Sequence, residues 1–321
     1  MRRRAIVLLN PAARSSRPLL SGSGSPSPRL ERLLTTLRAG GFDCELLMTN
    51  APGHAAELAR HAGTQGGLEA VFAIGGDGML RETAIGLLGG DLPLAPLPAG
   101  TANVLSRVLG IPRDAHRAAE LYAEATAAET RRLDVGLVAP VRDRSGSPPS
   151  AADGTPFLMM ASRGLDARAL ERLPLSWKRR FGRAGVALSG LRELLRGADP
   201  PFPYQVDGGD VRRAAFLSAS NIPLYGGSFV LAEGAAPDDH VLDVVALERH
   251  GRAALLGFAA KVLLGRSARP VRATEVSLPG SGSVVLQVDG DAVVVRLPAW
   301  IGLAAETLPV WLPRRAGWSR E

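Results

Sequence analysis

A carboxylate stands among glycines at residues 75–78, where Gly-Gly-Asp-Gly follows the apolar run AVFAIG at 70–75. Helix-like sequence begins almost at once, over 80–88. Glycines let the backbone turn sharply and approach a ligand, because they carry no Cβ. A helix that starts at such a turn points unpaired N–H groups and the positive end of its dipole at the ligand. The pattern predicts a phosphate-binding turn, and the alternative is a tight turn in which Asp77 caps the helix.

A second turn of the same kind follows in PLPAGTAN at 96–103. A strand is expected to end at Pro98, and Gly100 and Thr101 open another helix. Two adjacent strand ends, each followed by a glycine turn and a helix start, form the crevice in which open α/β sheets bind ligands. The sequence contains neither GxGxxG nor GxxxxGKS/T, so neither the usual dinucleotide fold nor a Walker-type phosphate lysine is indicated.

Short apolar runs alternate with helical segments in the first third of the chain. Strands are predicted at 5–10, 42–49, 70–75 and 92–98, and helices at 29–41, 54–63, 80–88 and 101–110. This alternation is typical of an α/β domain, a parallel sheet with helices on both faces. From residue 132 short strands and turn signals dominate, which predicts an antiparallel β-sandwich. We therefore expect an α/β domain at 1–131, a β-sandwich domain at 132–300, and a segment at 301–321 that packs back on the first domain.

Composition and charge narrow the classes of partner. Hydrophobic residues make up 46% of the 321 residues, which describes a globular protein. The net charge of +7 favours anionic partners, but no aromatic-studded basic run or zinc-ligand pattern supports nucleic acid. Cys44 is the only cysteine, so no internal disulfide forms and a reducing cytosol is expected. No run approaches the ~20 apolar residues that span a bilayer, and 253–265, with Lys261, is predicted to be an amphipathic helix.

Together these motifs resemble the diacylglycerol kinase catalytic domain family, which includes bacterial lipid kinases, sphingosine kinases and ceramide kinases. The family's GGDG turn matches 75–78, and its P-x-G-T-x-N motif matches 98–103. Later segments occur in the family's order: RLDVG (132–136), GLDA (164–167), SNIPLYGG (220–227), DDHVLDV (238–244) and QVDGD (287–291). The resemblance implies an ATP-dependent lipid kinase that uses Mg²⁺ and phosphorylates a diacylglycerol-like or related amphipathic alcohol.

The resemblance also implies roles for individual residues. The first domain is expected to bind the nucleotide through Asn10, Thr49, Gly75, Gly76, Asp77, Gly78, Glu82, Gly100, Thr101 and Asn103. Asp77 is expected to serve Mg²⁺, which takes oxygen ligands and keeps several waters. Phosphoryl transfer also needs a group that orients or deprotonates the attacking hydroxyl. The resemblance assigns this role to Asp291, with Asp289 as its partner or metal organiser, and the alternative is an ordinary Asp-Gly hairpin turn.

Three further features of the sequence suggest a metal site, a substrate contact and a membrane contact. The resemblance implies a structural Mg²⁺ in the loop at 236–241, held by the side chain of Asp239 and the carbonyl groups of Ala236 and Val241. It also implies that Asp166, in GLDA, reaches the head group of the lipid substrate. The segment LPLSWKRRFGR at 173–183 fits an ordinary amphipathic surface helix and a peripheral contact with an anionic membrane equally well.

Four positions depart from the family's motifs. Arg14 and His240 stand in place of glycines, Met79 in place of a threonine, and Asp291 in place of a glutamate. These departures support one alternative, a nucleotide-binding regulator that has lost catalysis. The other alternative is an NAD kinase-like enzyme, which also uses GGDG, although PAGTAN and the long β-rich region argue against it. We expect a cytoplasmic protein that binds peripherally at the inner face of the membrane. We expect no nucleic-acid partner, and a homodimer is one of the assemblies considered.

Overall fold

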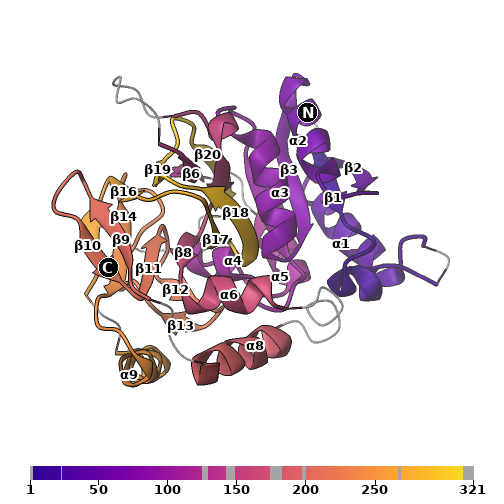
Figure 1. Ribbon diagram of the computed structural model, residues 1–321. Helices are drawn as coiled ribbons and strands as arrows, with labels where there is room; N and C mark the ends of the chain where they lie inside the picture. Colours follow the sequence, from indigo (N-terminus) through magenta and orange to yellow (C-terminus); the bar gives the residue numbers. More distant parts are fainter. Residues whose placement is uncertain are drawn as a thin grey trace. The chain divides into compact units, whose positions relative to one another are not determined.

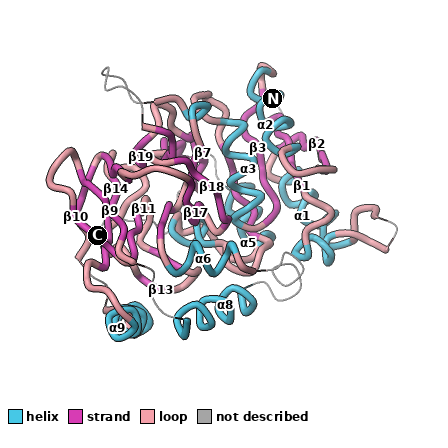
Figure 2. The backbone as a smooth tube through the Cα atoms, in the orientation of Figure 1, coloured by secondary structure: helices cyan, strands magenta, loops and turns pink. Residues whose placement is uncertain are grey.

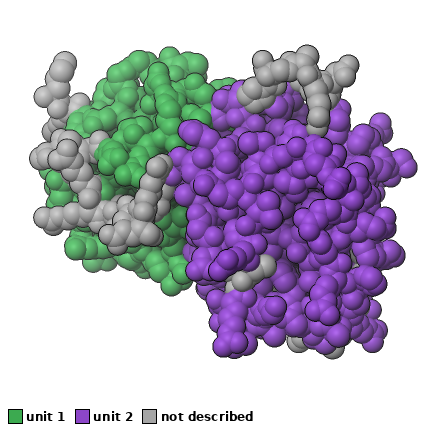
Figure 3. Space-filling view, turned by 90° about the vertical axis from the view of Figure 1, so that its left-hand side faces the viewer, with its two compact units in different colours: residues 1–133, 307–321 green, residues 134–306 purple. Residues whose placement is uncertain are grey.

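The structure is a computed structural model that describes residues 3–22, 24–124, 129–141, 149–173, 183–196, 200–266 and 269–313. The chain forms two compact units, unit 1 from residues 1–133 and 307–321, and unit 2 from residues 134–306 (Figure 3). Unit 2 is thus an insertion between two strands of unit 1. Helices and strands alternate in unit 1, whereas strands and loops make up most of unit 2 (Figure 2).

Unit 1 is built on a six-stranded sheet in the order β2-β1-β3-β4-β20-β5. Strands β1, β2, β3 and β20 are labelled in Figure 1. Its strands are β1 (Arg3–Leu9), β2 (Phe42–Met48), β3 (Leu68–Gly75), β4 (Leu94–Pro98), β5 (Glu129–Leu133) and β20 (Leu308–Leu312). The pairs β1–β2, β1–β3, β3–β4 and β4–β20 are parallel, and β20–β5 is antiparallel. Strands β1 and β3 are buried over most of their length, because a parallel sheet is covered on both faces.

The helices of unit 1 form two packed groups. They are α1 (Pro28–Ala39), α2 (His54–Thr64), α3 (Asp77–Leu87), α4 (Val104–Val108) and α5 (Ala115–Glu124), with a short 3₁₀ helix, η1 (Arg14–Leu19). Helix α1 packs against α5, and α2 packs against α3. Right-handed crossovers place α1 on one face of the sheet and α2 and α3 on the other, because the chain turns back between β2 and β3.

The C-terminal strand β20 closes the core of unit 1. Trp311 packs among Phe42, Phe72 and Tyr122, with ring centroids 5.5, 6.1 and 5.6 Å away. The Tyr122 hydroxyl donates a hydrogen bond of 3.2 Å to the carbonyl oxygen of Trp311. The segment beyond 306 therefore completes the first sheet, in which β20 lies between β4 and β5.

Unit 2 contains two six-stranded antiparallel sheets, β10-β9-β16-β19-β6-β7 and β15-β14-β11-β8-β17-β18, and a small hairpin, β12-β13. The strands are β6 (Gly136–Pro140), β7 (Thr155–Phe157), β8 (Met160–Arg163), β9 (Phe202–Val206), β10 (Arg212–Ala214), β11 (Phe216–Ser220), β12 (Leu224–Tyr225), β13 (Phe229–Val230), β14 (Leu242–Leu247), β15 (Val271–Ala273), β16 (Glu275–Leu278), β17 (Ser283–Val288), β18 (Asp291–Arg296) and β19 (Ala299–Leu303). The described helices are η2 (Ala151–Asp153), α6 (Leu165–Glu171), α8 (Arg183–Arg196) and α9 (Arg252–Leu263).

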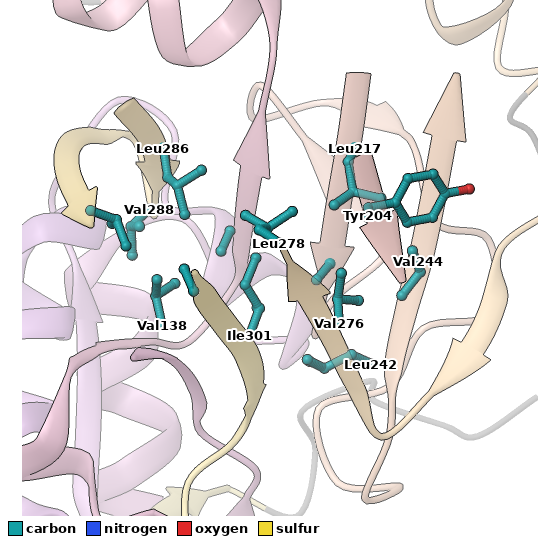
Figure 4. Packing of buried hydrophobic residues seen from close by; sticks show 14 of the residues in the cluster. Val138, Tyr204, Leu217, Leu242, Val244, Val276, Leu278, Leu286, Val288 and Ile301 are labelled. Carbon is teal, nitrogen blue, oxygen red and sulfur yellow. The ribbon is translucent and has the colours of Figure 1, made fainter. Parts of the chain in front are cut away.

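The inner faces of the two large sheets form the core of unit 2. Val276, Leu278 and Ile301 from one sheet pack with Leu286 and Val288 from the other (Figure 4). This packing is that of a β-sandwich, in which alternate residues of each strand point inward. The expected fold class, an α/β domain followed by an antiparallel β-sandwich, is confirmed.

The division into units falls close to the expected boundaries but not on them. Residues 301–303, expected in the C-terminal segment, belong to β19, where Ile301 pairs with Val138 of β6 and Val276 of β16. The chain leaves unit 2 only after residue 306, because these ladder hydrogen bonds hold β19 inside the sandwich. Within the described ranges, no helix is both long enough and apolar enough to cross a membrane.

Candidate active site

The two glycine turns lie against each other at the ends of β3 and β4. These strands pair in register up to Gly75 and Pro98, and the N–H of Ala99 donates to the carbonyl oxygen of Gly75 at 2.9 Å. A Cβ added to Gly100 would stand 2.5 Å from the Cα of Gly76. Real Cβ atoms do not approach that closely, so the absence of a side chain at Gly100 permits this backbone contact.

Asn103 holds the second turn in shape. It is 2% exposed and has a left-handed φ of 48°. Its side-chain amide donates to the carbonyl oxygen of Gly100 at 2.9 Å, and its Oδ1 accepts from the N–H of Gly100 at 3.0 Å. The N–H of Gly100 is therefore used inside the turn, whereas Thr101 is exposed at its surface. Asn103 shapes the turn, and Thr101 is the residue of this motif that can meet a ligand.

Asp77 connects the two turns. It is the first residue of α3, and its Oδ1 accepts a hydrogen bond of 3.2 Å from the N–H of Leu105, in the first turn of α4. The carboxylate thus caps the neighbouring helix α4. A half-buried carboxylate at this point lies beside the N-termini of both helices, whose positive dipole ends favour anions.

Asn10 and Thr49 lie at the same edge of the sheet as the glycine turns. In the parallel ladders Leu9 pairs with Met48 and with Ile74, so β1, β2 and β3 end level with one another. Asn10 and Thr49 directly follow β1 and β2. The Asn10 Oδ1 accepts from the N–H of Ala12 at 2.9 Å, and Thr49 is 6% exposed. In the sheet, the chain passes from β1 to β2 on one side and from β3 to β4 on the opposite side. The ends of β1 and β3 therefore flank a topological switch point, and Asn10 and Thr49 lie next to it.

Glu82 has a different position from the other residues assigned to the nucleotide. One of its carboxylate oxygens accepts the N–H of Ala55 at 3.0 Å, in the first turn of α2. The N-cap of that helix is Gly53, which has a φ of 88° and no side chain with which to cap it. Glu82 therefore caps α2 from α3, and this geometry supports a structural role.

Met79, where the family has a threonine, packs beneath the first turn. It is 8% exposed, and a Cβ on Gly75 would stand 2.5 Å from the Met79 Cβ. The departure from the motif is thus accommodated in the core of unit 1, with Gly75 as the residue that makes room.

In unit 2, Asp289 and Gly290 form the two-residue turn of the β17–β18 hairpin. Their φ angles of 49° and 89° are both left-handed, as a type I′ turn requires. The Asp289 carboxylate accepts three backbone N–H groups, from Leu158 at 2.8 Å, Met159 at 2.9 Å and Met160 at 3.0 Å. Sequence reasoning weighed the hairpin turn, but it had no signal for this anchor to a segment 130 residues away.

Asp291 is the exposed acid of the same hairpin. It begins β18 and pairs with Val288, the last residue of β17. Because the Asp289 carboxylate is engaged by three backbone donors, Asp291 is the better placed of the two to meet a substrate from solvent.

Asp166 lies in a buried polar network that adjoins this hairpin through the β8–β17 pairing. The Ser162 hydroxyl is 2.5 Å from Asp166 Oδ2 and 3.0 Å from Gln287 Oε1. Burial raises the pKa of Asp166, and hydrogen bonds from Ser162, Ala167 and Tyr225 oppose the shift. Burial also raises the pKa of Tyr225 well above its usual value, and the charge of Asp166 adds to the effect.

Perturbed ionisation of this kind is common at functional sites. Ser162, Tyr225 and Gln287 were not among the expected site residues. Tyr225 lies in the SNIPLYGG segment and Gln287 in the QVDGD segment. Both segments match the family's motifs, so the sequence could have indicated these two residues.

In the loop at 236–241, the carboxylate expected to bind a metal ion is paired with an arginine. The Arg272 guanidinium is 2.5 Å from Asp239 Oδ2, and Asp239 Oδ1 accepts the N–H of Val241 at 3.4 Å. His240 takes a φ of 62°, and its N–H and Nδ1 both lie 2.7 Å from the carboxylate of Asp134. Across the described parts of the chain, no cluster of three His, Cys, Asp or Glu side chains could hold a metal. An arginine thus provides the positive charge at Asp239.

One expected feature cannot be placed. Residues 174–182 of the LPLSWKRRFGR segment lie outside the described residues.

Comparison with known proteins gives two family matches. Residues 4–138 match the family described as "Diacylglycerol kinase catalytic domain", and residues 159–312 match "YegS C-terminal NAD kinase beta sandwich-like domain". The chain is similar to a protein named "Diacylglycerol kinase" from Mycobacterium tuberculosis, with 27% identity over 309 residues, 92% of this chain and 93% of the relative. It is also similar to a "Probable lipid kinase YegS-like" from Pseudomonas aeruginosa, 28% identical over 235 residues and covering 70% of each.

The fold has solved counterparts. A structure titled "A putative diacylglycerol kinase from Bacillus anthracis str. Sterne" superposes with a TM-score of 0.71 over 94% of each chain. The sequence identity is 22%, so this likeness shows a shared fold.

Proposed function

The chain belongs to the family of diacylglycerol kinases and YegS-like lipid kinases, and we propose that it is an ATP-dependent lipid kinase. It transfers the γ-phosphoryl group of ATP to a hydroxyl of a diacylglycerol-like or related amphipathic alcohol. The observation that carries the proposal is the backbone contact between Gly76 and Gly100, which brings two helix N-termini to one edge of the sheet. We further propose that the enzyme works in the cytoplasm, at the inner face of the membrane.

The nucleotide site is assigned to the carboxyl edge of the sheet in unit 1. The polyphosphate would lie on the glycine turn at the start of α3, where backbone N–H groups and the helix dipole stabilise negative charge. The Thr101 hydroxyl is exposed and adds a donor. Asn10 and Thr49, at the neighbouring strand ends, would contact the rest of the nucleotide.

Magnesium fits this turn because the Asp77 carboxylate provides an oxygen ligand beside the phosphates. Bound there with the nucleotide, Mg²⁺ would neutralise charge on the phosphate oxygens. Asp77 also keeps α3 and α4 together through Leu105, so it would both order the turn and provide a ligand to the metal.

The acceptor site is assigned to unit 2. Asp291, exposed at the β17–β18 turn, would take the proton of the attacking hydroxyl, directly or through water. Asp166, with Ser162 and Tyr225, would hydrogen-bond to the polar head group of the lipid. Asp289 would keep the hairpin in place through its three backbone hydrogen bonds.

The test is phosphoryl transfer from labelled ATP to a panel of lipids. Asp77→Asn and Asp291→Asn should each lower kcat/KM, Asp77 by about a hundredfold or more and Asp291 by about 10²–10⁴-fold. Matched controls are Asp91→Asn, whose side chain is 96% exposed, and Asp210→Asn in an exposed loop of unit 2. Both controls should keep full activity.

Three outcomes would contradict the proposal. Labelling of NAD in place of any lipid would identify an NAD kinase. Nucleotide binding without turnover on every acceptor would identify a regulator. Full activity in both variants would remove the assigned roles of Asp77 and Asp291.

A further inference from the structure

Helix α9 exposes large apolar side chains on its outer face. Leu256 is 50% exposed, Leu263 is 62% exposed, and Leu264, which directly follows the helix, is 72% exposed. Ala253 and Ala260 are also exposed, and their spacing with Leu256 and Leu263 places all four on one side of the helix. The outer face of α9, defined by these five residues, therefore lacks the polar character of an ordinary surface helix.

The opposite side of α9 already has its partner in the fold. Leu255 and Val262 are buried, and the ring of Phe258 lies 5.2 Å from that of Phe216 in β11. Val262 and Phe258 belong to a small apolar cluster with Leu231 and Val245. These contacts set which way the helix faces and leave the outer leucines exposed to solvent. Contiguous exposed apolar side chains of this kind mark interaction surfaces.

The chain segment that contains α9 is basic. Residues 249–274 contain six basic residues and no Asp or Glu: Arg249, Arg252, Lys261, Arg266, Arg269 and Arg272. Arg272 is bound to Asp239, and Arg252 donates to the carbonyl oxygen of Arg196 in α8. Lys261 and Arg266 are exposed next to the outer leucines. An apolar stripe bordered by cations complements a surface of acyl chains and anionic head groups.

The neighbouring helix also exposes a leucine. Helices α8 and α9 lie side by side at the lower edge of unit 2 in Figure 1. Leu188 of α8 is 43% exposed. Helix α9 has 12 residues, far fewer than the ~20 that span a bilayer, so it suits a position in the interface plane.

We propose that the outer face of α9 docks unit 2 onto an anionic phospholipid membrane. Leu256, Leu263 and Leu264 enter the boundary of the acyl chains, and Lys261 and Arg266 bind lipid phosphates. The proposal rests on the proposed function only for the choice of partner, because a diacylglycerol-like acceptor lies in a bilayer.

The experiment measures co-sedimentation of the full chain, without nucleotide, with vesicles of phosphatidylcholine alone or mixed with phosphatidylglycerol. The triple variant Leu256→Gln/Leu263→Gln/Leu264→Gln should lower the partition coefficient on mixed vesicles by about tenfold or more, because the inserted apolar area is lost. The matched control Val141→Gln/Val211→Gln changes side chains that are 45% and 60% exposed elsewhere in unit 2. It should bind as the wild type does.

A second arm tests the charge. Lys261→Gln/Arg266→Gln should weaken binding to mixed vesicles by about 30-fold, since each basic residue contributes ~1 kcal/mol at an anionic surface. Binding to phosphatidylcholine alone should change little, and added salt should reduce the difference. The control Arg38→Gln/Arg117→Gln removes the same charge from unit 1 and should leave binding intact.

The outcomes separate this proposal from the kinase itself. The leucine variant should phosphorylate a short-chain diacylglycerol in detergent micelles at the wild-type rate and lose activity on vesicles. Leucine-dependent vesicle binding without phosphoryl transfer to any acceptor would support docking and overturn the kinase. Equal vesicle binding by wild type and leucine variant would overturn the docking surface. So would sedimentation showing that these leucines serve only to join two copies of the chain.

Discussion

Gly76 and Gly100 are in backbone contact, and a single methyl group tests whether that contact matters. A Cβ on Gly100 would stand 2.5 Å from the Gly76 Cα and 2.6 Å from Asn103 Oδ1, so the two turns must separate in Gly100→Ala. We expect a stability loss of about 1–3 kcal/mol. We also expect kcat/KM for ATP to fall by about a hundredfold, because small misplacements of binding groups are costly.

Urea unfolding and steady-state kinetics measure the two effects of Gly100→Ala. The matched control is Gly63→Ala in α2, where a Cβ meets nothing within 4 Å. It should keep activity and gain about 0.5–1 kcal/mol, because alanine is the better helix former. A Gly100→Ala enzyme that binds and turns over ATP normally would show that the turn contact has no role in function.

Asp166 gives a pH-dependent prediction at the same scale. Burial raises its pKa in the folded protein, so the folded state binds this proton more tightly than the unfolded chain does. The contribution of Asp166 to stability is therefore present at low pH and is lost as pH rises from the usual carboxyl pKa through the raised one. Asp166→Asn lacks this titration. The free energy of unfolding of the wild type minus that of the variant should fall over this interval.

Urea unfolding of both proteins at a series of pH values provides the measurement for Asp166. A difference that grows with pH would mean that the folded protein stabilises the ionised carboxylate, contrary to the buried geometry. In the proposed function a neutral Asp166 would donate a hydrogen bond to the lipid head group, so the KM for lipid should rise over the same pH interval.

At the scale of elements, three carboxylates act on the backbone of a distant segment. Asp77 caps α4, Glu82 caps α2, and Asp289 binds the backbone of residues 158–160. Each bond joins an element of the candidate site to its neighbour, and charge-assisted bonds to N–H groups are stronger than neutral ones. These carboxylates therefore hold glycine-containing turns in position, because glycine by itself leaves the backbone flexible.

The loop at 236–241 leads to a prediction about metal removal. Arg272 of β15 binds the Asp239 carboxylate, so the loop should need no divalent cation. Without nucleotide, the melting temperature of the wild type should be the same in Mg²⁺ and in EDTA. Arg272→Gln should lower stability by about 0.5–1 kcal/mol, as expected for a partly exposed ion pair.

Added Mg²⁺ should restore part of the stability of Arg272→Gln, because Asp239 then lacks a cation. The control Arg212→Gln removes a comparable exposed pair with Glu248 and should show no response to Mg²⁺. Destabilisation of the wild type by EDTA would contradict the assignment and support a structural metal at Asp239.

At the scale of the whole chain, unit 1 is discontinuous in sequence. Strand β20 joins the first sheet after the chain has completed unit 2, and Trp311 fills the aromatic core. Trp311 is 3% exposed, so Trp311→Ala should cost about 3–5 kcal/mol of stability. Nucleotide binding should be lost with it, because the sheet that holds both glycine turns includes β20.

Thermal unfolding with and without Mg-ATP checks the Trp311 prediction. Leu264→Ala, at a position 72% exposed, is the control and should unfold as the wild type does. A Trp311→Ala protein of unchanged stability would show that unit 1 folds without its last strand.

The local sequence was sufficient to predict the two kinds of unit and the two glycine turns. Apolar runs such as AIVLL and AVFAIG mark buried parallel strands, and glycines mark sharp reversals, because both depend on residues close together in the chain. The same reasoning placed α9 within a few residues and offered a hairpin turn at Asp-Gly 289–290 as one alternative, and the structure has that turn.

Contacts between distant segments could be read only from the folded chain. The sequence offered Asp77 as a cap of its own helix and gave no signal that its carboxylate reaches Leu105 in α4. The tie from Asp289 to residues 158–160 and the pair between Arg272 and Asp239 likewise join residues far apart in sequence. A carboxylate accepts whichever donor the packing of strands and helices brings within about 3 Å. That choice depends on the whole fold, so no pattern of neighbouring residues records it.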